Sequence, residues 1–250
     1  MAFPVTSVLD TFTGTNGADL PVYSANWSAQ TGAVNLEIQG NAATSSSAAL
    51  GANYWNVSNF GPNCEVYATI STKQADGDGL DLVARAQQES SLSTLDGYGL
   101  ELQVVAGTDT VAIIRIDNGT GTVLGSAVGQ EIGAGDALGL EIIGNTLMLY
   151  RKPSGGSWAT LGSLQTDSTY PNAGKLELLL VNTVVRVDDF GGGTIPAGSG
   201  GGVMDDRFRF RPSVTSSYTA GQAFKRSAWP EDSRDFSRRD NIADNRSRAL

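Results

Sequence analysis

Residues 65–70 read Glu-Val-Tyr-Ala-Thr-Ile, in which Val, Ala and Ile alternate with Glu, Tyr and Thr. A period of two indicates a β-strand with one face in the core, because successive side chains of a strand point to opposite faces. The same alternation, or a short apolar run rich in β-branched residues, recurs at 79–86, 98–105, 110–117, 137–143, 146–151, 175–182 and 184–190. Turn residues separate these segments and no helical period lies between them. The sequence therefore predicts antiparallel sheets packed face to face.

Two hairpins are predicted from their turns. The pentapeptide Asp-Asn-Gly-Thr-Gly at 117–121 lies between two apolar segments, and so does Gly144-Asn145. Asn and Gly tolerate the positive φ values that tight hairpin turns require. We interpret Asp-Gly-Asp-Gly at 76–79 as a third hairpin turn rather than a calcium loop, because Gln87 stands where an EF-hand loop has its bidentate Glu.

The residue types present exclude several catalytic and metal-binding mechanisms. The chain contains no histidine, which removes the commonest general base and zinc ligand and every Ser-His or Cys-His dyad. The single cysteine, Cys64, cannot form an internal disulfide and is interpreted as a small buried apolar residue.

Charge and glycine content divide the chain into parts. Residues 1–202 contain 7 Lys or Arg and 19 Asp or Glu, whereas residues 203–250 contain 10 and 7. An acidic body repels nucleic acid, which is therefore not an expected partner. We predict a β-sandwich domain at 1–190, a Gly-rich linker at 191–202 and an extended basic C-terminal anchoring arm at 203–250.

The arm contains the segment Arg-Phe-Arg-Phe-Arg at 207–211. In an extended strand its arginines lie on one side and its phenylalanines on the other. Composition alone is typical of a disordered tail. We expect instead that the arm adds as a strand to a neighbouring subunit and pairs its arginines with acidic surface. The predicted assembly residues are Arg207, Phe208, Arg209, Phe210, Arg211 and Trp229.

Several residues of the body occur in an order known from one fold family. They are Asp10-Thr11-Phe12, Leu20, Trp27, Gly32, the segment 79–85, the segment 97–100, Gly135-Asp136, the segment 147–150 and Val187-Asp188-Asp189-Phe190. This order resembles the concanavalin A-like lectin and glucanase family, in its laminin G-like variants, over about residues 1–192. The resemblance implies an all-β, antiparallel two-sheet jelly-roll sandwich whose first and last strands are adjacent. Phe12 and Phe190, as inward residues near the two ends, suit that closure.

The resemblance also implies a structural calcium ion in some members. The candidate ligands are Asp10 with Asp188 or Asp189, near the two ends of the domain. The alternative is that these carboxylates cap strand ends, because calcium needs about six or more oxygen ligands and few others can be named. Calcium is the only cofactor that the sequence suggests.

Sugar binding is the other property that the resemblance implies. Tyr54, Trp55 and Phe60 cluster in a predicted loop of Asn and Ser residues. Aromatic faces stack on the apolar faces of sugars while amides bond to their hydroxyl rims, which makes this trio the candidate carbohydrate site. The alternative is that the trio covers the open end of the core. Trp27 and Trp158 are assigned to packing.

Enzymatic activity is not expected. Glucanases of this fold carry two carboxylates a few residues apart on one strand, and glycoside hydrolysis needs such a pair. No such run occurs here, and Glu101, Glu141 and Glu177 each stand isolated among apolar residues.

We therefore expect a non-enzymatic structural protein of a virion, most simply a bacteriophage head decoration or tail-associated component. Its jelly roll would face outward, and its arm would contact other virion proteins and copies of itself. The alternative is a carbohydrate-binding module or lectin for a cell-surface polysaccharide, such as a host surface glycan. The first residues lack the features of a signal peptide, and no stretch approaches the ~20 apolar residues that cross a bilayer, so we expect synthesis in a host cytoplasm and no membrane partner.

Overall fold

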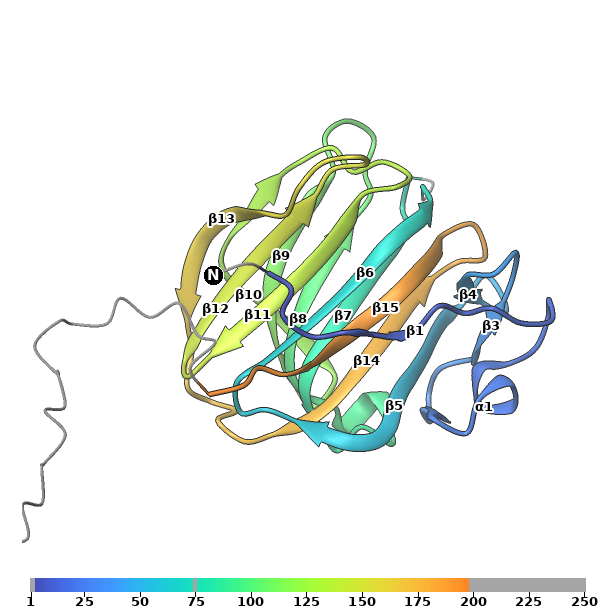
Figure 1. Cartoon of the computed structure of the whole chain (residues 1–250), viewed down its shortest axis with the longest axis horizontal. Helices are drawn as coiled ribbons and strands as arrows, with labels where there is room; N and C mark the ends of the chain where they lie inside the picture. The colour runs from blue at the N-terminus through green and yellow to red at the C-terminus, as the bar shows by residue number, and fades with distance from the viewer. Residues whose placement is uncertain (1–2, 74–75, 198–250) are drawn as a thin grey trace, which may run out of the picture. The chain divides into compact units, whose positions relative to one another are not determined.

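Two antiparallel sheets stack face to face in the computed structural model, which describes residues 3–73 and 76–197 (Figure 1). The eight-stranded sheet runs in the order β13 (Ala159–Thr166), β12 (Thr146–Lys152), β11 (Ala137–Ile143), β6 (Cys64–Thr72), β15 (Arg186–Thr194), β4 (Ala43–Ser45) and β3 (Leu36–Ile38), with β1 (Val8–Asp10) paired to β15. The seven-stranded sheet runs in the order β10 (Thr120–Gly129), β9 (Thr110–Asp117), β8 (Asp96–Gln103), β7 (Gly79–Gln87), β14 (Gly174–Val181), β5 (Leu50–Phe60) and β2 (Trp27–Ala29). Helical structure in the described part consists of α1 (Leu20–Tyr23) and the 3-10 turn η1 (Leu92–Thr94). The predicted all-β sandwich is confirmed.

Both predicted hairpins are present. In the β9–β10 turn Asn118 and Gly119 have φ values of 47° and 73°, and in the β11–β12 turn Gly144 has a φ of 58°. The third predicted hairpin is wrong, because β6 and β7 on either side of residues 76–79 belong to different sheets. A local turn signal shows that the chain reverses, but it does not show whether the next strand joins the same sheet.

The two ends of the domain meet at one aromatic cluster. β1 pairs with β15, so the first and last strands are adjacent as expected. The indole ring of Trp27 is buried between the rings of Phe12, Trp55 and Phe190, with ring centroids 5.9, 5.3 and 5.1 Å away. Large aromatic side chains bury much apolar area, so this cluster holds the closure of the sandwich. The assignment of Trp27 to packing is confirmed.

The last strand extends past the predicted domain boundary at residue 190. β15 runs to Thr194, and Gly191 and Gly192 are buried opposite β6. A Cβ atom at Gly191 would overlap the ring of Tyr67, and one at Gly192 would overlap the carbonyl oxygen of Glu65. These glycines therefore allow a close approach of β15 to neighbouring groups. Their assignment to a flexible linker is wrong for this reason.

The remainder of the predicted linker from residue 198 and the whole predicted arm lie outside the described residues, including Arg207, Phe208, Arg209, Phe210, Arg211 and Trp229. Within the described ranges, no helix combines the length and the apolar character needed to cross a membrane.

Candidate carbohydrate site

The outer face of the seven-stranded sheet carries two carboxylates on neighbouring strands. In β7, Leu80 and Leu82 are buried in the core, and the alternation of the strand places Asp81 between them on the outer face. In β8, the same alternation places Glu101 outward between buried leucines. The register pairs Asp81 directly with Glu101. Side chains in such antiparallel pairs have Cβ atoms only about 4.5–5.5 Å apart, so the two carboxyl groups form one unit.

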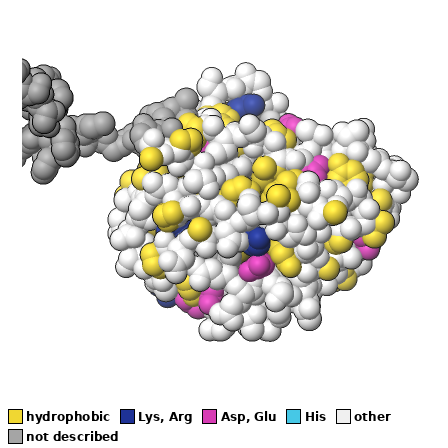
Figure 2. Space-filling model, turned by 60° about the horizontal axis from the view of Figure 1, so that its bottom comes forward, with side chains coloured by type: hydrophobic (Ala, Val, Ile, Leu, Met, Phe, Trp, Pro, Cys, Tyr) yellow, Lys and Arg dark blue, Asp and Glu magenta, His cyan; other side chains and the backbone are white. Residues whose placement is uncertain are grey.

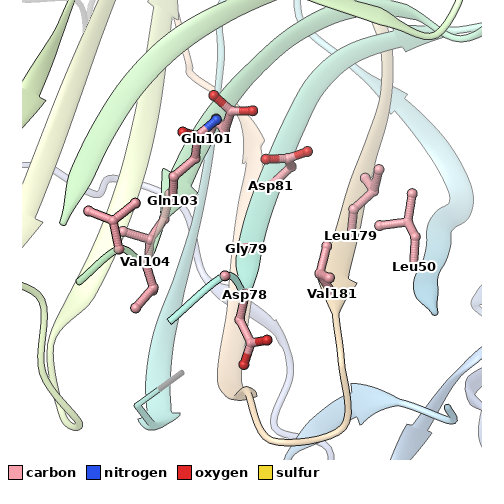
Figure 3. A pocket seen from close by; sticks show the side chains of 12 residues that line it. Leu50, Asp78, Gly79, Asp81, Glu101, Gln103, Val104, Leu179 and Val181 are labelled. Atoms are coloured by element: carbon pink, nitrogen blue, oxygen red, sulfur yellow. The ribbon is translucent and has the colours of Figure 1, made fainter. Parts of the chain in front are cut away.

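This pair lines a depression of about 300 Å³ in the sheet surface (Figure 3). Asp81, Glu101 and Gln103 provide its polar side, and Leu179 and Val181 of β14 provide much of its apolar side, as Figure 3 shows. The other lining residues are Leu50, Gly77, Asp78, Gly79, Leu102, Val104 and Val105. Ligand pockets in proteins typically have volumes of ~300–1,000 Å³ and mix apolar walls with a few polar groups. The depression therefore has the size and lining of a small ligand site.

Asp78 also lines the depression but is directed elsewhere. Its side chain is buried and accepts a hydrogen bond of 3.0 Å from the amide of Asn182. Figure 3 shows its carboxylate pointing away from those of Asp81 and Glu101. Asp78 thus stabilises the edge of the depression. The paired carboxylates of Asp81 and Glu101 are the acidic groups that face into it.

Burial and charge change the protonation of the pair. Burial, followed by the negative charge of Glu101, raises the pKa of Asp81 to about 7. Two carboxyl groups this close favour a state in which one of them holds a proton. Near neutral pH the pair therefore offers one hydrogen-bond donor and several acceptors, and Gln103 adds an amide group with both.

Pairing of Asp81 with Glu101 overturns the expectation that Glu101 stands isolated. Two acids a few residues apart on one strand are visible in a sequence, whereas this pair joins two strands and is separated by twenty residues. The alternation of leucines around each residue was the available signal, because it places both acids on the outer face. The register between β7 and β8 then brings the two acids side by side. This register cannot be predicted from the sequence of either strand alone.

Tyr54, Trp55 and Phe60 do not form the aromatic platform expected from the sequence. They lie on β5, an eleven-residue strand, and not in a loop. Trp55 points into the core, where only 6% of it is exposed and its ring contacts Trp27 edge-on at 5.3 Å. Phe60 is half-buried against the same core. Trp55 is therefore wrong as a sugar ligand, and the alternative of core cover is correct for it.

Tyr54 alone of this trio lies on the outer face with the carboxylate pair. It is half-buried and pairs with Glu177 of β14, which in turn pairs with Val83 of β7. Tyr54 is thus one cross-strand row and two strands away from Asp81. A ligand longer than one sugar ring is needed to contact both.

The predicted calcium ligands serve as acceptors for protein donors. Asp10 is buried, and its carboxylate accepts hydrogen bonds from the Phe12 backbone N–H at 2.7 Å, the Tyr23 hydroxyl at 3.0 Å and the Trp27 indole N–H at 2.8 Å. Three of the roughly four acceptor positions of this carboxylate are taken by these donors. Within residues 3–73 and 76–197, no group of three or more His, Cys, Asp or Glu is placed to hold a metal ion.

Asp188 and Asp189 fit a calcium ion no better. The side chain of Asp188 accepts a 2.7 Å hydrogen bond from the backbone N–H of Asp189, and Asp189 has a φ of 49°. Burial, and next the charges of Asp189 and Asp10, raise the pKa of Asp188. A calcium ion needs about six or more oxygens free to converge on it, and the hydrogen bonds at Asp10 and Asp188 occupy several of the oxygens that these residues offer. The residues therefore do not fit the calcium site that the sequence suggested, and the alternative role at strand ends describes them.

One face of the sandwich carries few charged side chains. On the face seen in Figure 2, hydrophobic side chains occur in small groups among polar and backbone atoms, and Lys, Arg, Asp and Glu are sparse. Sparse charge favours ligands recognised by hydrogen bonds and apolar contact over polyanions.

Comparison with known proteins finds similarity in fold alone. No protein-family model and no curated protein sequence matches the chain. Among solved structures, the VIP36 exoplasmic/lumenal domain in a Ca2+/Man2-bound form is similar over 76% of this chain and 87% of that domain, with a TM-score of 0.55 and 10% identity.

Two further solved structures have lower similarity in shape. Carbohydrate-binding module CBM66 from Bacillus subtilis matches 68% of this chain and 94% of its own, with a TM-score of 0.45 and 17% identity. The CBM2 module of the evolved Dit protein of Lactobacillus casei BL23 phage J-1 matches 75% and 94%, with a TM-score of 0.48 and 11% identity. At 10% identity, the likeness to the VIP36 domain concerns the two-sheet sandwich fold alone.

Proposed function

We propose that this protein binds carbohydrate on the outer face of its seven-stranded sheet, at the depression lined by Asp81, Glu101 and Gln103. The observation that carries the proposal is the directly paired carboxylates beside an aliphatic wall. A sugar presents hydroxyl groups that both donate and accept, next to C–H faces that are apolar. A half-protonated carboxyl pair and an amide match the hydroxyl groups, and Leu179 and Val181 match the C–H face.

The similarity in fold to the VIP36 exoplasmic/lumenal domain, solved in a Ca2+/Man2-bound form, supports carbohydrate as the ligand class. It favours carbohydrate binding over the structural role in a virion that the sequence first suggested. The virion role depends on the arm at 203–250, which lies outside the described residues, and stays a prediction.

The test is binding of soluble gluco-, manno- and galacto-oligosaccharides to the full chain, by a glycan array followed by isothermal titration calorimetry. We expect Glu101→Gln to weaken binding about 10-fold or more, because a hydrogen bond to a charged group contributes about 1.5–3 kcal/mol. Asp81→Asn should weaken binding less, because the asparagine amide keeps the shape and also offers a donor and an acceptor. Glu37→Gln is the matched control, because it makes the same change on a half-buried residue of β3 in the other sheet.

Two results would contradict the proposal. Unchanged affinity in both site variants would place the sugar elsewhere. Cleavage of an oligosaccharide by the wild type, lost in Glu101→Gln, would show that the pair is a hydrolytic acid and nucleophile and not a binding pair.

A further inference from the structure

A second hollow, of about 670 Å³, lies on the opposite side of the sandwich, on the outer face of the eight-stranded sheet. Its lining combines three aromatic rings with hydroxyl groups and one ammonium group. The lining residues that matter here are Phe3, Tyr150, Lys152, Ser157, Trp158 and Thr160.

A cross-strand row of residues explains why this hollow is aromatic. Tyr67 of β6, Gly139 of β11 and Tyr150 of β12 are directly paired across three strands. Phe3 lies over Gly139, where a Cβ atom would overlap its ring, and stacks on Tyr150 with centroids 4.1 Å apart and planes 4° apart. A glycine between two tyrosines thus makes the space in which the phenylalanine ring is seated.

The chain segment that carries Phe3 is fixed to the sheet. Glu65 accepts hydrogen bonds from the backbone N–H groups of Val5 at 2.8 Å and Thr6 at 2.6 Å, and the Tyr67 hydroxyl donates to the carbonyl of Thr6 at 2.9 Å. The Tyr150 hydroxyl lies 3.3 Å from the carboxylate of Glu141. These bonds hold the aromatic rings in place before a ligand arrives, which lowers the entropy lost on binding.

Trp158 stands at the outer edge of this cluster. Its ring contacts Phe3 edge-on at 4.9 Å and Tyr67 edge-on at 6.1 Å, yet the residue is only half-buried. The assignment of Trp158 to packing alone is therefore incomplete, because part of the ring is available on the surface. A rigid, partly exposed indole is a good stacking surface for an apolar ring face.

Three polar side chains line the hollow together with this ring. Lys152 ends β12, Ser157 immediately precedes Trp158, and Thr160 pairs with Tyr150 across β12 and β13. Lys152 makes no ion pair with any described residue, so its ammonium group can donate to a ligand. None of the described residues that line the hollow is a carboxylate.

From this arrangement we infer that the eight-stranded sheet carries a second sugar site, in which a neutral hexopyranose stacks on Trp158 and bonds to Lys152, Ser157 and Thr160. The inference rests on the proposed function for the class of ligand, and it adds a second, independent site on the opposite sheet. Because the two sites lie on opposite sides of the sandwich, one protein molecule with both would link two polysaccharide chains, one on each face.

The test is isothermal titration calorimetry of the full chain with the gluco-, manno- and galacto-oligosaccharides used above. We expect Trp158→Ala to remove one of two bound ligands per chain, or to weaken that binding about 10-fold or more, as loss of a central tryptophan commonly does. Leu164→Ala is the matched control, because Leu164 is a 51% exposed hydrophobic residue on the adjacent β13. Trp158→Phe keeps an aromatic ring that can pack on Phe3, so this variant should keep part of the affinity. It replaces Trp158→Ala as the test if that variant fails to fold.

Comparison with Glu101→Gln separates the two proposals. Loss of one ligand in Trp158→Ala and of the other in Glu101→Gln supports both sites. Unchanged binding in both Trp158 variants, with loss in Glu101→Gln, overturns the second site and leaves the first. Loss in the Trp158 variants alone leaves the second site and overturns the first. No binding of any oligosaccharide by the wild type overturns both.

Discussion

Replacing Arg85 by Met should lower the free energy of unfolding by about 3–5 kcal/mol, the largest effect that we expect from a single substitution. Arg85 is fully buried, and its guanidinium group donates to three backbone carbonyls: Pro62 at 2.7 Å, Tyr170 at 2.9 Å and Gly144 at 2.7 Å. Each carbonyl belongs to a different connection, between β5 and β6, β13 and β14, and β11 and β12. Methionine fills a similar apolar volume but removes all three hydrogen bonds, each of about 1.5–3 kcal/mol to a charged group, and it also removes the cost of burying the guanidinium charge, which offsets part of that loss.

Urea unfolding followed by circular dichroism measures this change. Arg115→Met is the control, because Arg115 forms ion pairs with Asp117 and Asp167 at the surface, with 29% of its side chain exposed. A surface pair of this kind contributes about 0–1 kcal/mol. A loss of less than about 1 kcal/mol in Arg85→Met would show that Arg85 does not hold these three connections together.

Replacing Glu177 by Gln should stabilise the protein at pH 8 by roughly 1–3 kcal/mol and have little effect near pH 4. Glu177 is 0% exposed, its Oε2 accepts a 3.2 Å hydrogen bond from Gln30, and its Oε1 has no partner. Burial raises the pKa of this carboxyl well above its usual value, and the charge of Glu89 adds to the shift.

The sign of this effect follows from where the proton is held. Between the ordinary pKa of an unfolded glutamate and the higher pKa in the folded protein, the folded state keeps a proton that the unfolded state has released. Stability therefore falls as pH rises through this range, and a glutamine, which does not ionise, removes the fall.

Urea unfolding of both proteins at pH 4 and pH 8 measures the difference. Glu131→Gln is the contrasting control, because Glu131 is exposed and the Lys73 ammonium group lowers the pKa of its carboxyl. That variant should show no gain at pH 8. An equal change at both pH values in Glu177→Gln would mean that ionisation of Glu177 does not limit stability.

Local patterns explain the parts of the fold that the sequence predicts. The alternation at 65–70 and in seven other segments reports directly on which side chains face the core, so the strands β6 to β9, β11, β12, β14 and β15 follow from it. The positive φ values at Asn118 and Gly144 follow from residues that tolerate them. The inward positions of Phe12 and Phe190 follow from the resemblance to the concanavalin A-like family, whereas the place of Trp27 between them is seen only in the structure.

Non-local contacts explain the parts that the sequence misses. The sequence of β5 predicts a loop because Asn53 and Asn56 interrupt its apolar residues. In the structure Asn53 is buried, and its amide group forms hydrogen bonds with Ser28, Asn35 and Leu36. A polar residue satisfied by tertiary hydrogen bonds cannot be distinguished from a loop residue by composition. The Asp81–Glu101 pair depends on strand register, and the seating of Phe3 over Gly139 depends on three strands at once.

The most direct test of the central claim is to map a bound sugar by NMR on protein labelled at its Leu and Val methyl groups. The probe is the oligosaccharide of the panel that binds the wild type most tightly. The account predicts shifts of the Leu50, Leu179 and Val181 methyl signals on titration, and loss of these shifts in Glu101→Gln. Saturating sugar that leaves these three residues unshifted in the wild type would contradict carbohydrate binding at the paired carboxylates.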